Sequence, residues 1–194
     1  MKSIHLLLPV ILFIFASCSN ETDSDESNGS ETTFEEQTGP IEYPELEGLT
    51  KEQVELMMQN LDDYCQALTE NDLEKSLAYI YPKVVEMAVN KLGITKEEYL
   101  KKVLEARTKT QAMGIKMLAY SFDSPRQPLI FDGSIYTVID GTVKFMQKEI
   151  EREIPTQMIA ISKDQGNSWY YLKKDQSYLE ILQDELPEEL LQQL

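Results

Sequence analysis

The hydrophobic pattern of this chain changes its period once, at Gly114. Before Gly114, apolar residues recur at the three- and four-residue spacing of amphipathic helices, and after it β-branched and aromatic residues form strand-like runs. An order of helices followed by an antiparallel meander is typical of an α+β domain. We therefore expect a curved antiparallel sheet wrapped round the first long helix, which buries the apolar face of each.

Capping boxes start two of the four expected helices. Thr50 with Gln53 starts a helix over about 51–69, and Thr95 with Glu98 starts another that ends at the change of period. Apolar residues at helical spacing predict the inward faces of these two helices. They are Val54, Met57, Leu61, Tyr64 and Leu68 in the first and Tyr99, Val103, Ala106 and Met113 in the second.

Two shorter helices are expected between them. Asn71 with Glu74 repeats the start signal and indicates a helix that ends near Tyr81. Pro82 at a first-turn position opens the next helix, and Gly93 closes it. The inward residues of this helix are predicted to be Val84, Val85 and Ala88.

Five strand-like runs follow, all rich in β-branched and aromatic residues. Asp140-Gly141 is a two-residue hairpin signal between the second and third runs, and residues 164–167 turn the fourth into the fifth. A short helical C-terminal tail is expected from Tyr178, with Pro187 opening its last turns. The predicted strands are 115–122, 135–139, 142–147, 156–162 and 168–173.

The amino terminus has the three parts of a secretory signal. Lys2 supplies a positive charge, residues 6–15 are almost all apolar, and small residues precede Cys18. The apolar run is too short to span a membrane, which takes about 20 residues. We therefore expect residues 1–17 to be removed as a signal peptide.

The segment Phe15-Ala16-Ser17-Cys18 resembles the lipobox of bacterial lipoproteins, with Phe15 where that family usually has Leu. The resemblance implies that signal peptidase cuts before Cys18 and that this cysteine is the lipidation site, which anchors the protein in a membrane of the bacterial cell envelope. Two or three acyl chains hold firmly, because each buried CH₂ contributes about 0.8 kcal/mol. An ordinary signal peptide with an incidental cysteine is the alternative.

Residues 19–47 contain ten acidic residues and no Lys or Arg. Such a composition cannot bury enough apolar surface to fold, so residues 18–47 are expected to form a lipidated, disordered tether. Residues 19–26 are similar to the acidic stretch that follows the lipidated cysteine in surface-exported lipoproteins of Bacteroidota. This similarity implies the outer membrane and exposure at the cell surface, and a plain soluble spacer is the alternative.

Residues 48–194 are long enough for one domain with its own core. The chain as a whole has a formal net charge of -16, whereas nucleic acid and anionic lipid surfaces select partners with basic stripes. We therefore expect no nucleic acid partner. Cys65 is the only thiol left once Cys18 is acylated, so no intrachain disulfide can form. Cys65 itself is predicted to be a small buried hydrophobic residue.

The order of these elements resembles the cone of the NTF2-like superfamily. The resemblance covers about 49–174 and rests on the opening amphipathic helix, the passage from 68–72 to Tyr81-Pro82, and the closing run of long strands. Residues 158–171 are similar to the last hairpin of uncharacterised Bacteroidota lipoproteins with that fold. Related cones include isomerases and dehydratases that use an Asp or a Tyr-Asp pair, but no position here matches such a motif.

The mature chain has no histidine, because His5 lies in the signal. Ser-His-Asp and Cys-His nucleophiles are therefore excluded, and the ligand found in most catalytic zinc sites is absent. No calcium loop of the EF-hand type appears, and Asp132 and Asp140 lie beside glycines and are interpreted as turn residues. We predict no catalytic residue, no metal site and no cofactor.

Ser162, Asp164, Gly166 and Trp169 match the Asp-box pattern of sialidase-type propellers. A propeller needs several blades of about 40 residues, so one copy in a domain of this size predicts a rigid turn rather than a glycan site. Trp169 beside the Gly turn is expected to cover an edge of the core. Alternation places Trp169 and Tyr171 on one face of the last strand.

Carboxylate pairs such as Asp62-Asp63 and Glu149-Glu151 lie in stretches that look exposed, whereas a general base needs a pocket that shifts its pKa. The leading hypothesis is therefore a non-enzymatic envelope module that binds an envelope protein or a small apolar ligand. A metal-free cone enzyme using carboxylate acid-base chemistry and a purely structural surface protein are the alternatives. One set of aromatic residues has two interpretations: the rings fill the core, or some of them hold an apolar ligand at an open cone mouth. The set is Tyr64, Tyr81, Tyr120, Phe122, Tyr136, Phe145, Trp169 and Tyr171.

Overall fold

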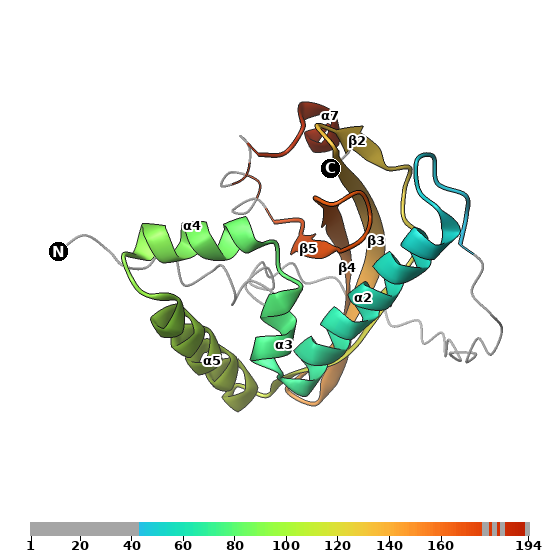
Figure 1. The fold of residues 1–194 in the computed structure, drawn as a ribbon. Helices are drawn as coiled ribbons and strands as arrows, with labels where there is room; N and C mark the ends of the chain where they lie inside the picture. Colours follow the sequence, from blue (N-terminus) through green and yellow to red (C-terminus); the bar gives the residue numbers. More distant parts are fainter. Residues whose placement is uncertain (1–42, 176–178, 180–181, 183–184, 193–194) are drawn as a thin grey trace.

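The computed structural model describes residues 43–175, 179, 182 and 185–192. Cys18, the signal peptide and almost all of the predicted tether lie outside these residues, as does much of the helical tail predicted from Tyr178. In the described part, helices precede strands and every pair of strands is antiparallel, which confirms the α+β order. Figure 1 shows α2 (Lys51–Glu70) lying across a strongly curled sheet, an arrangement compatible with a cone.

The strands form one sheet in the order β1-β3-β4-β5, and β2 pairs with the first residues of β3. The connection between β1 and β2 stays on the edge of β3, because the backbone N–H groups of Asp123 and Arg126 donate to the carbonyls of Asp140 and Val138, both at 2.9 Å. One edge of β3 is therefore covered along most of its length. The strands are β1 (Ile115–Phe122), β2 (Leu129–Phe131), β3 (Ser134–Gln147), β4 (Ile150–Ser162) and β5 (Tyr170–Lys173).

The hairpin predicted at Asp140-Gly141 is wrong. Both residues lie inside β3, which joins two of the predicted strands into one, and the turn falls at Lys148 and Glu149, whose φ angles are 50° and 66°. Asp140 accepts hydrogen bonds from Arg126 Nε at 2.8 Å and from Nη2 at 2.9 Å. A side chain–side chain ion pair, rather than a turn, therefore explains this aspartate.

Four helices are described before the sheet, and α7 (Glu188–Leu191) follows it. Both predicted capping boxes are confirmed, since Thr50 and Gln53 exchange hydrogen bonds at the start of α2 and Thr95 and Glu98 do so at the start of α5. The third predicted helix begins at Pro82 and is capped by Gly93, as expected. The remaining bounds are α3 (Leu73–Ala78), α4 (Pro82–Leu92) and α5 (Lys96–Ala112).

Two helix ends differ from the prediction. Asn71 has a φ of 66° and ends α2, whereas Asp72 caps α3 by accepting the backbone N–H three residues on at 2.9 Å. Met113 lies just beyond α5 and is 57% exposed, so its prediction as an inward residue is wrong. Thr110 occupies the last buried position of that helix instead.

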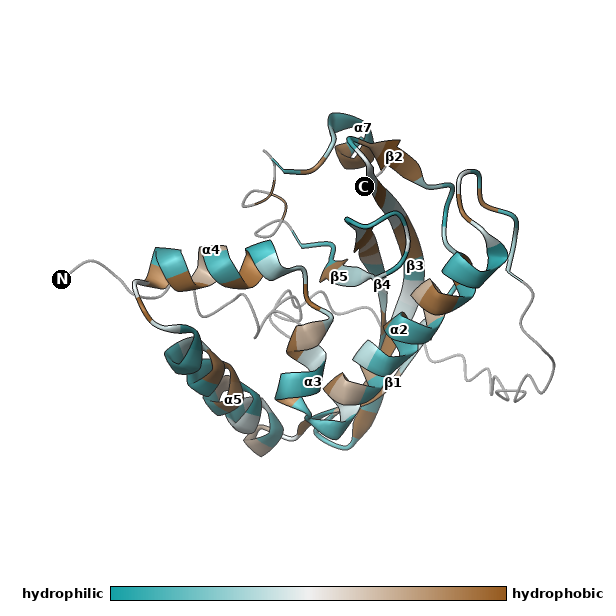
Figure 2. Cartoon of the chain, viewed as in Figure 1, coloured by the Kyte–Doolittle hydropathy of each residue, from teal (hydrophilic) through white to brown (hydrophobic). Residues whose placement is uncertain are grey.

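The sheet buries residues on both faces. On the face toward α2, Met158, Ala160, Trp169 and Tyr171 pack into one cluster with the helix, which confirms that Trp169 is buried in the core. The opposite face is covered by the start of α4 and the C-terminal segment, and Figure 2 shows the hydrophobic colouring along β3 and β4. All described core clusters are built from residues 43–191.

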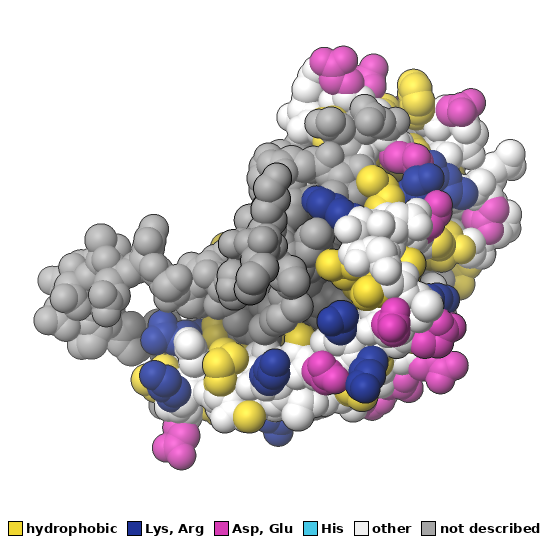
Figure 3. All heavy atoms as spheres, turned by 90° about the vertical axis from the view of Figure 1, so that its left-hand side faces the viewer, with side chains coloured by type: hydrophobic (Ala, Val, Ile, Leu, Met, Phe, Trp, Pro, Cys, Tyr) yellow, Lys and Arg dark blue, Asp and Glu magenta, His cyan; other side chains and the backbone are white. Residues whose placement is uncertain are grey.

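The pair α4 and α5 packs through a third cluster around Ala88, Tyr99 and Val103. Residues 82–112 carry seven Lys or Arg against four Glu, which is a basic excess in an acidic chain. Figure 3, which views the side of the molecule where α4 and α5 lie, shows Lys and Arg side chains among hydrophobic ones. Among the described residues, none of the helices combines the length and the apolar composition that a membrane span requires.

Candidate functional site

A cavity of about 400 Å³ opens between the curled sheet and helices α2, α3 and α5. This volume is within the range of about 300–1,000 Å³ that is typical of small-molecule sites. The strands and the helices each supply both apolar and polar side chains to its lining. Among the apolar lining residues are Leu68, Val103, Ile115, Met117, Val143 and Met158.

Arg107 enters this cavity from α5. Its helix turns a stripe of residues at three- and four-residue spacing toward the cavity, and Arg107 lies in that stripe between Val103 and Thr110. The Nη1 atom of Arg107 is buried and has no hydrogen-bond partner among the residues that the structure describes. Burial lowers the pKa of Arg107, but a guanidinium stays protonated in proteins. The cavity therefore contains a buried cationic donor that the described residues do not satisfy.

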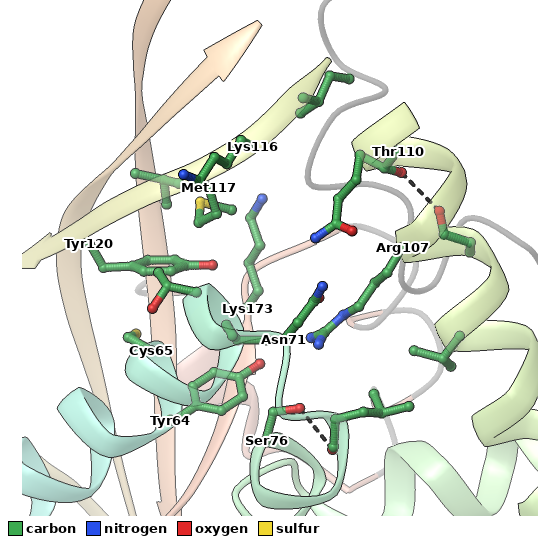
Figure 4. A pocket seen from close by; sticks show the side chains of 18 of the residues that line it. Tyr64, Cys65, Asn71, Ser76, Arg107, Thr110, Lys116, Met117, Tyr120 and Lys173 are labelled. Atoms are coloured by element: carbon green, nitrogen blue, oxygen red, sulfur yellow. Dashed lines mark hydrogen bonds between the residues drawn. The ribbon is translucent and has the colours of Figure 1, made fainter. Parts of the chain in front are cut away.

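Two tyrosines approach from the opposite side. Tyr64 comes from α2 and Tyr120 from β1, and Figure 4 shows both rings at the cavity with Arg107 reaching toward them. Burial raises the pKa of each phenol well above its usual value, and the positive charge of Arg107 opposes this rise. Both phenols therefore remain neutral hydroxyls that donate and accept hydrogen bonds.

Lys173 and Lys116 line the cavity from the sheet, and Lys116 is exposed. The Lys173 side chain extends from β5 into the space between Tyr120 and Arg107 in Figure 4, and burial lowers its pKa while the nearby Asp175 carboxylate opposes that shift. Asp175 is the single carboxylate among the described lining residues. Cations therefore outnumber anions around a cavity in a chain whose net charge is -16.

Thr156 is a second lining residue with an unsatisfied polar atom. It lies on β4 opposite Gly141 of β3, and its side chain is nearly fully buried. The Oγ1 hydroxyl has no hydrogen-bond partner within the described part of the chain. Native proteins leave few buried polar groups unpaired, so two such groups at one cavity indicate a missing polar partner.

The structure divides the predicted aromatic set into two groups. Tyr64 and Tyr120 line the cavity, and Tyr64 also belongs to the core cluster at α2, whereas the other six rings lie in the core or at its margins. Cys65 is buried as predicted, lines the cavity, and has its pKa raised by burial. These six rings are Tyr81, Tyr136, Phe145, Trp169 and Tyr171 in the core and Phe122 at its margin.

The Asp-box residues form a hydrogen-bonded turn, as predicted. Asp164 accepts the Ser168 N–H at 2.9 Å and the Ser168 hydroxyl at 2.6 Å, and these bonds hold the pKa of Asp164 below its usual value. The Gly166 N–H donates to Ser162 Oγ at 2.8 Å. Trp169 packs in the core beside this turn, so the pattern is structural here.

The carboxylates singled out in the sequence lie away from the cavity lining. Asp62, Glu149 and Glu151 are exposed, and Asp63 is half-buried and pairs with Lys75 at 3.3 Å. Asp132 stands in the turn between β2 and β3, where a turn was expected. Within the described ranges, no group of three or more Cys, Asp or Glu side chains is arranged to hold a metal ion.

Sequence reasoning missed Arg107, Lys116, Thr156 and Lys173. Two of them carried a usable signal, since Arg107 falls on the inward stripe of its helix and Lys173 lies two residues after the buried Tyr171, on the same face of β5. Comparison of the chain with protein-family models, with curated proteins and with solved structures finds no match.

Proposed function

We propose that this protein is a lipid-anchored envelope module whose domain binds a small, largely apolar molecule in the cavity between the sheet and helices α2, α3 and α5. The observation that carries the proposal is the cavity itself, which is of ligand size and walled mainly by apolar side chains. A domain with no ligand to hold would gain stability by filling such a space, since a buried void costs packing energy.

The shape of the domain supports this role. A long helix laid across a strongly curled antiparallel sheet is compatible with the NTF2-like cone, and the space between the two is where a cone keeps its ligand. The cone enzyme with carboxylate acid-base chemistry is less well supported, because Asp175 is the single carboxylate among the described residues that line the cavity.

A neutral hydrophobic fluorophore, N-phenyl-1-naphthylamine, tests the proposal. The protein is the chain from Ser19 onward, which contains every residue of the described core clusters. Ala106→Trp fills the cavity from α5, and we expect it to weaken fluorophore binding at least about tenfold.

Leu104→Trp is the matched control, because Leu104 is on the same helix and is 50% exposed. This variant should bind the fluorophore as the wild type does. Equal affinity in all three proteins, or no binding by the wild type, would contradict the proposed function.

The anchor is tested separately at Cys18. The Cys18→Ala variant should take up no alkyne-tagged palmitate in bacterial cells and should leave the membrane fraction, because its only proposed lipidation site is gone. Persistent labelling of this variant would refute the anchor and would leave the cavity proposal untouched.

A further inference from the structure

We propose that the ligand is amphipathic and carries one anionic headgroup, such as a carboxylate, which binds to Arg107 inside the cavity. This inference rests on the proposed function and specifies the chemical class of the molecule that the cavity holds. It follows from the position of one guanidinium, the balance of charge around it and the hydroxyl groups nearby.

The guanidinium of Arg107 is the cation that enters the cavity from α5. Its buried Nη1 donor is unpaired among the described residues, although buried charges in proteins are normally paired and hydrogen-bonded. Leaving such a donor unsatisfied is costly, and its planar fork matches the two oxygens of a carboxylate. An anionic headgroup in the cavity would supply the partner that the protein does not.

The charged side chains that line the cavity are mostly positive. Three cations line the cavity, Arg107, Lys116 and Lys173, and Asp175 is the one anion among the described lining residues. Apolar walls lower the local dielectric, so charges interact more strongly there than in water. The cavity therefore favours an anion.

Neutral hydroxyl groups also line the cavity. The phenols of Tyr64 and Tyr120 remain protonated, and the buried hydroxyl of Thr156 is unpaired in the described structure. A neutral hydroxyl group stabilises an anion by donating a hydrogen bond to it. The cavity thus adds neutral hydroxyl donors to its cations, and an anionic headgroup can accept hydrogen bonds from both.

Part of the cavity wall on the sheet is apolar. Met117, Val143 and Met158 form an apolar wall on the sheet, whereas Arg107 enters from α5. A molecule with an anion at one end and a hydrocarbon body at the other would match both surfaces. A fully polar anion would leave the apolar wall without a partner.

Titration calorimetry with two ligands of equal chain length tests the inference. Decanoate carries the anion and decanol lacks it, and both are used below the concentrations at which they aggregate. The wild-type chain from Ser19 onward should bind decanoate at least about tenfold more tightly than decanol. Equal binding of both would refute the headgroup and leave the proposed function standing, whereas no binding of either would refute both.

Variants at position 107 assign the headgroup to its partner. Arg107→Met keeps a long apolar stem, so it should bind decanol as the wild type does and should lose the preference for decanoate. Arg107→Lys keeps the charge without the planar fork and should retain part of the preference, which provides a second test if the Met variant fails to fold. Lys102→Met, at an exposed position of the same helix, should change neither affinity. A preference for decanoate that survives in Arg107→Met would overturn the assignment to Arg107.

Discussion

Phe122 packs its ring over Gly141, in the space that a Cβ atom on residue 141 would occupy. The two residues face each other across β1 and β3. Gly141 does not have a positive φ, so it is close packing, and not an unusual backbone conformation, that requires a glycine in the middle of this long strand.

Gly141→Ala is expected to lower the free energy of unfolding by about 1–3 kcal/mol, because the added methyl group forces Phe122 or its strand to move. Urea denaturation followed by circular dichroism measures this loss. When Phe122 is also replaced by Ala, Gly141→Ala should cost less unfolding free energy. Some cost should remain, since the carbonyl of Ser121 also meets the new Cβ. An identical loss in both backgrounds would show that the ring contact is not its cause.

The same glycine shows what a sequence pattern can and cannot reveal. The helix starts at Thr50 and Thr95 were predictable because a capping box is a contact between residues three apart. Asp140-Gly141 looked like a hairpin because the residues that decide otherwise, Phe122 and Arg126, are distant in the sequence.

The cavity could not be predicted from the sequence, because it also depends on residues that are distant along the chain. Alternation and helical spacing predict which residues face inward, but whether the space between them is filled depends on side chains from three helices and four strands that only the fold brings together. A charged residue on an inward stripe, such as Arg107, was the one local sign that this core is not wholly apolar.

Trp169 is 2% exposed and lies in the cluster between the sheet and α2. Trp169→Ala is expected to lower the free energy of unfolding by about 3–5 kcal/mol, as truncation of buried aromatic residues does. Trp169→Phe should cost less, since it keeps a ring, and the indole N–H has no hydrogen-bond partner among the described residues.

Thermal unfolding and fluorophore binding separate the two roles of this residue. A Trp169→Ala protein that keeps the wild-type melting temperature but loses the fluorophore would place Trp169 in the binding site and contradict its structural role.

Asp140 gives the stability a defined dependence on pH. Hydrogen bonds from Gln157 and from Arg126 hold the pKa of its carboxyl below the usual value. A depressed pKa in the folded state adds stability above the unfolded pKa of about 3.9, and this gain is lost as the pH falls through the lower folded value. The gain is less than about 1 kcal/mol, because the side chain is 38% exposed and solvent screens the pair.

The Asp140→Asn variant isolates this contribution. The wild type should be more stable than the variant by a constant amount above about pH 5, and the difference should shrink below about pH 4. Asp132→Asn removes the same charge from an exposed turn and is the control. A wild-type advantage that grows as the pH falls would contradict the role assigned to the pair with Arg126.

Methyl NMR locates the bound ligand most directly. Met117 and Met158 line the cavity, whereas Met113 is 57% exposed just beyond α5, so methionine methyl labelling reports both places in one sample. With decanoate bound to the chain from Ser19 onward, we predict nuclear Overhauser contacts from the ligand chain to the methyl groups of Met117 and Met158 and none to Met113. Contacts to Met113 alone, or no contact to either cavity methionine under saturating ligand, would contradict the account that this cavity is the binding site.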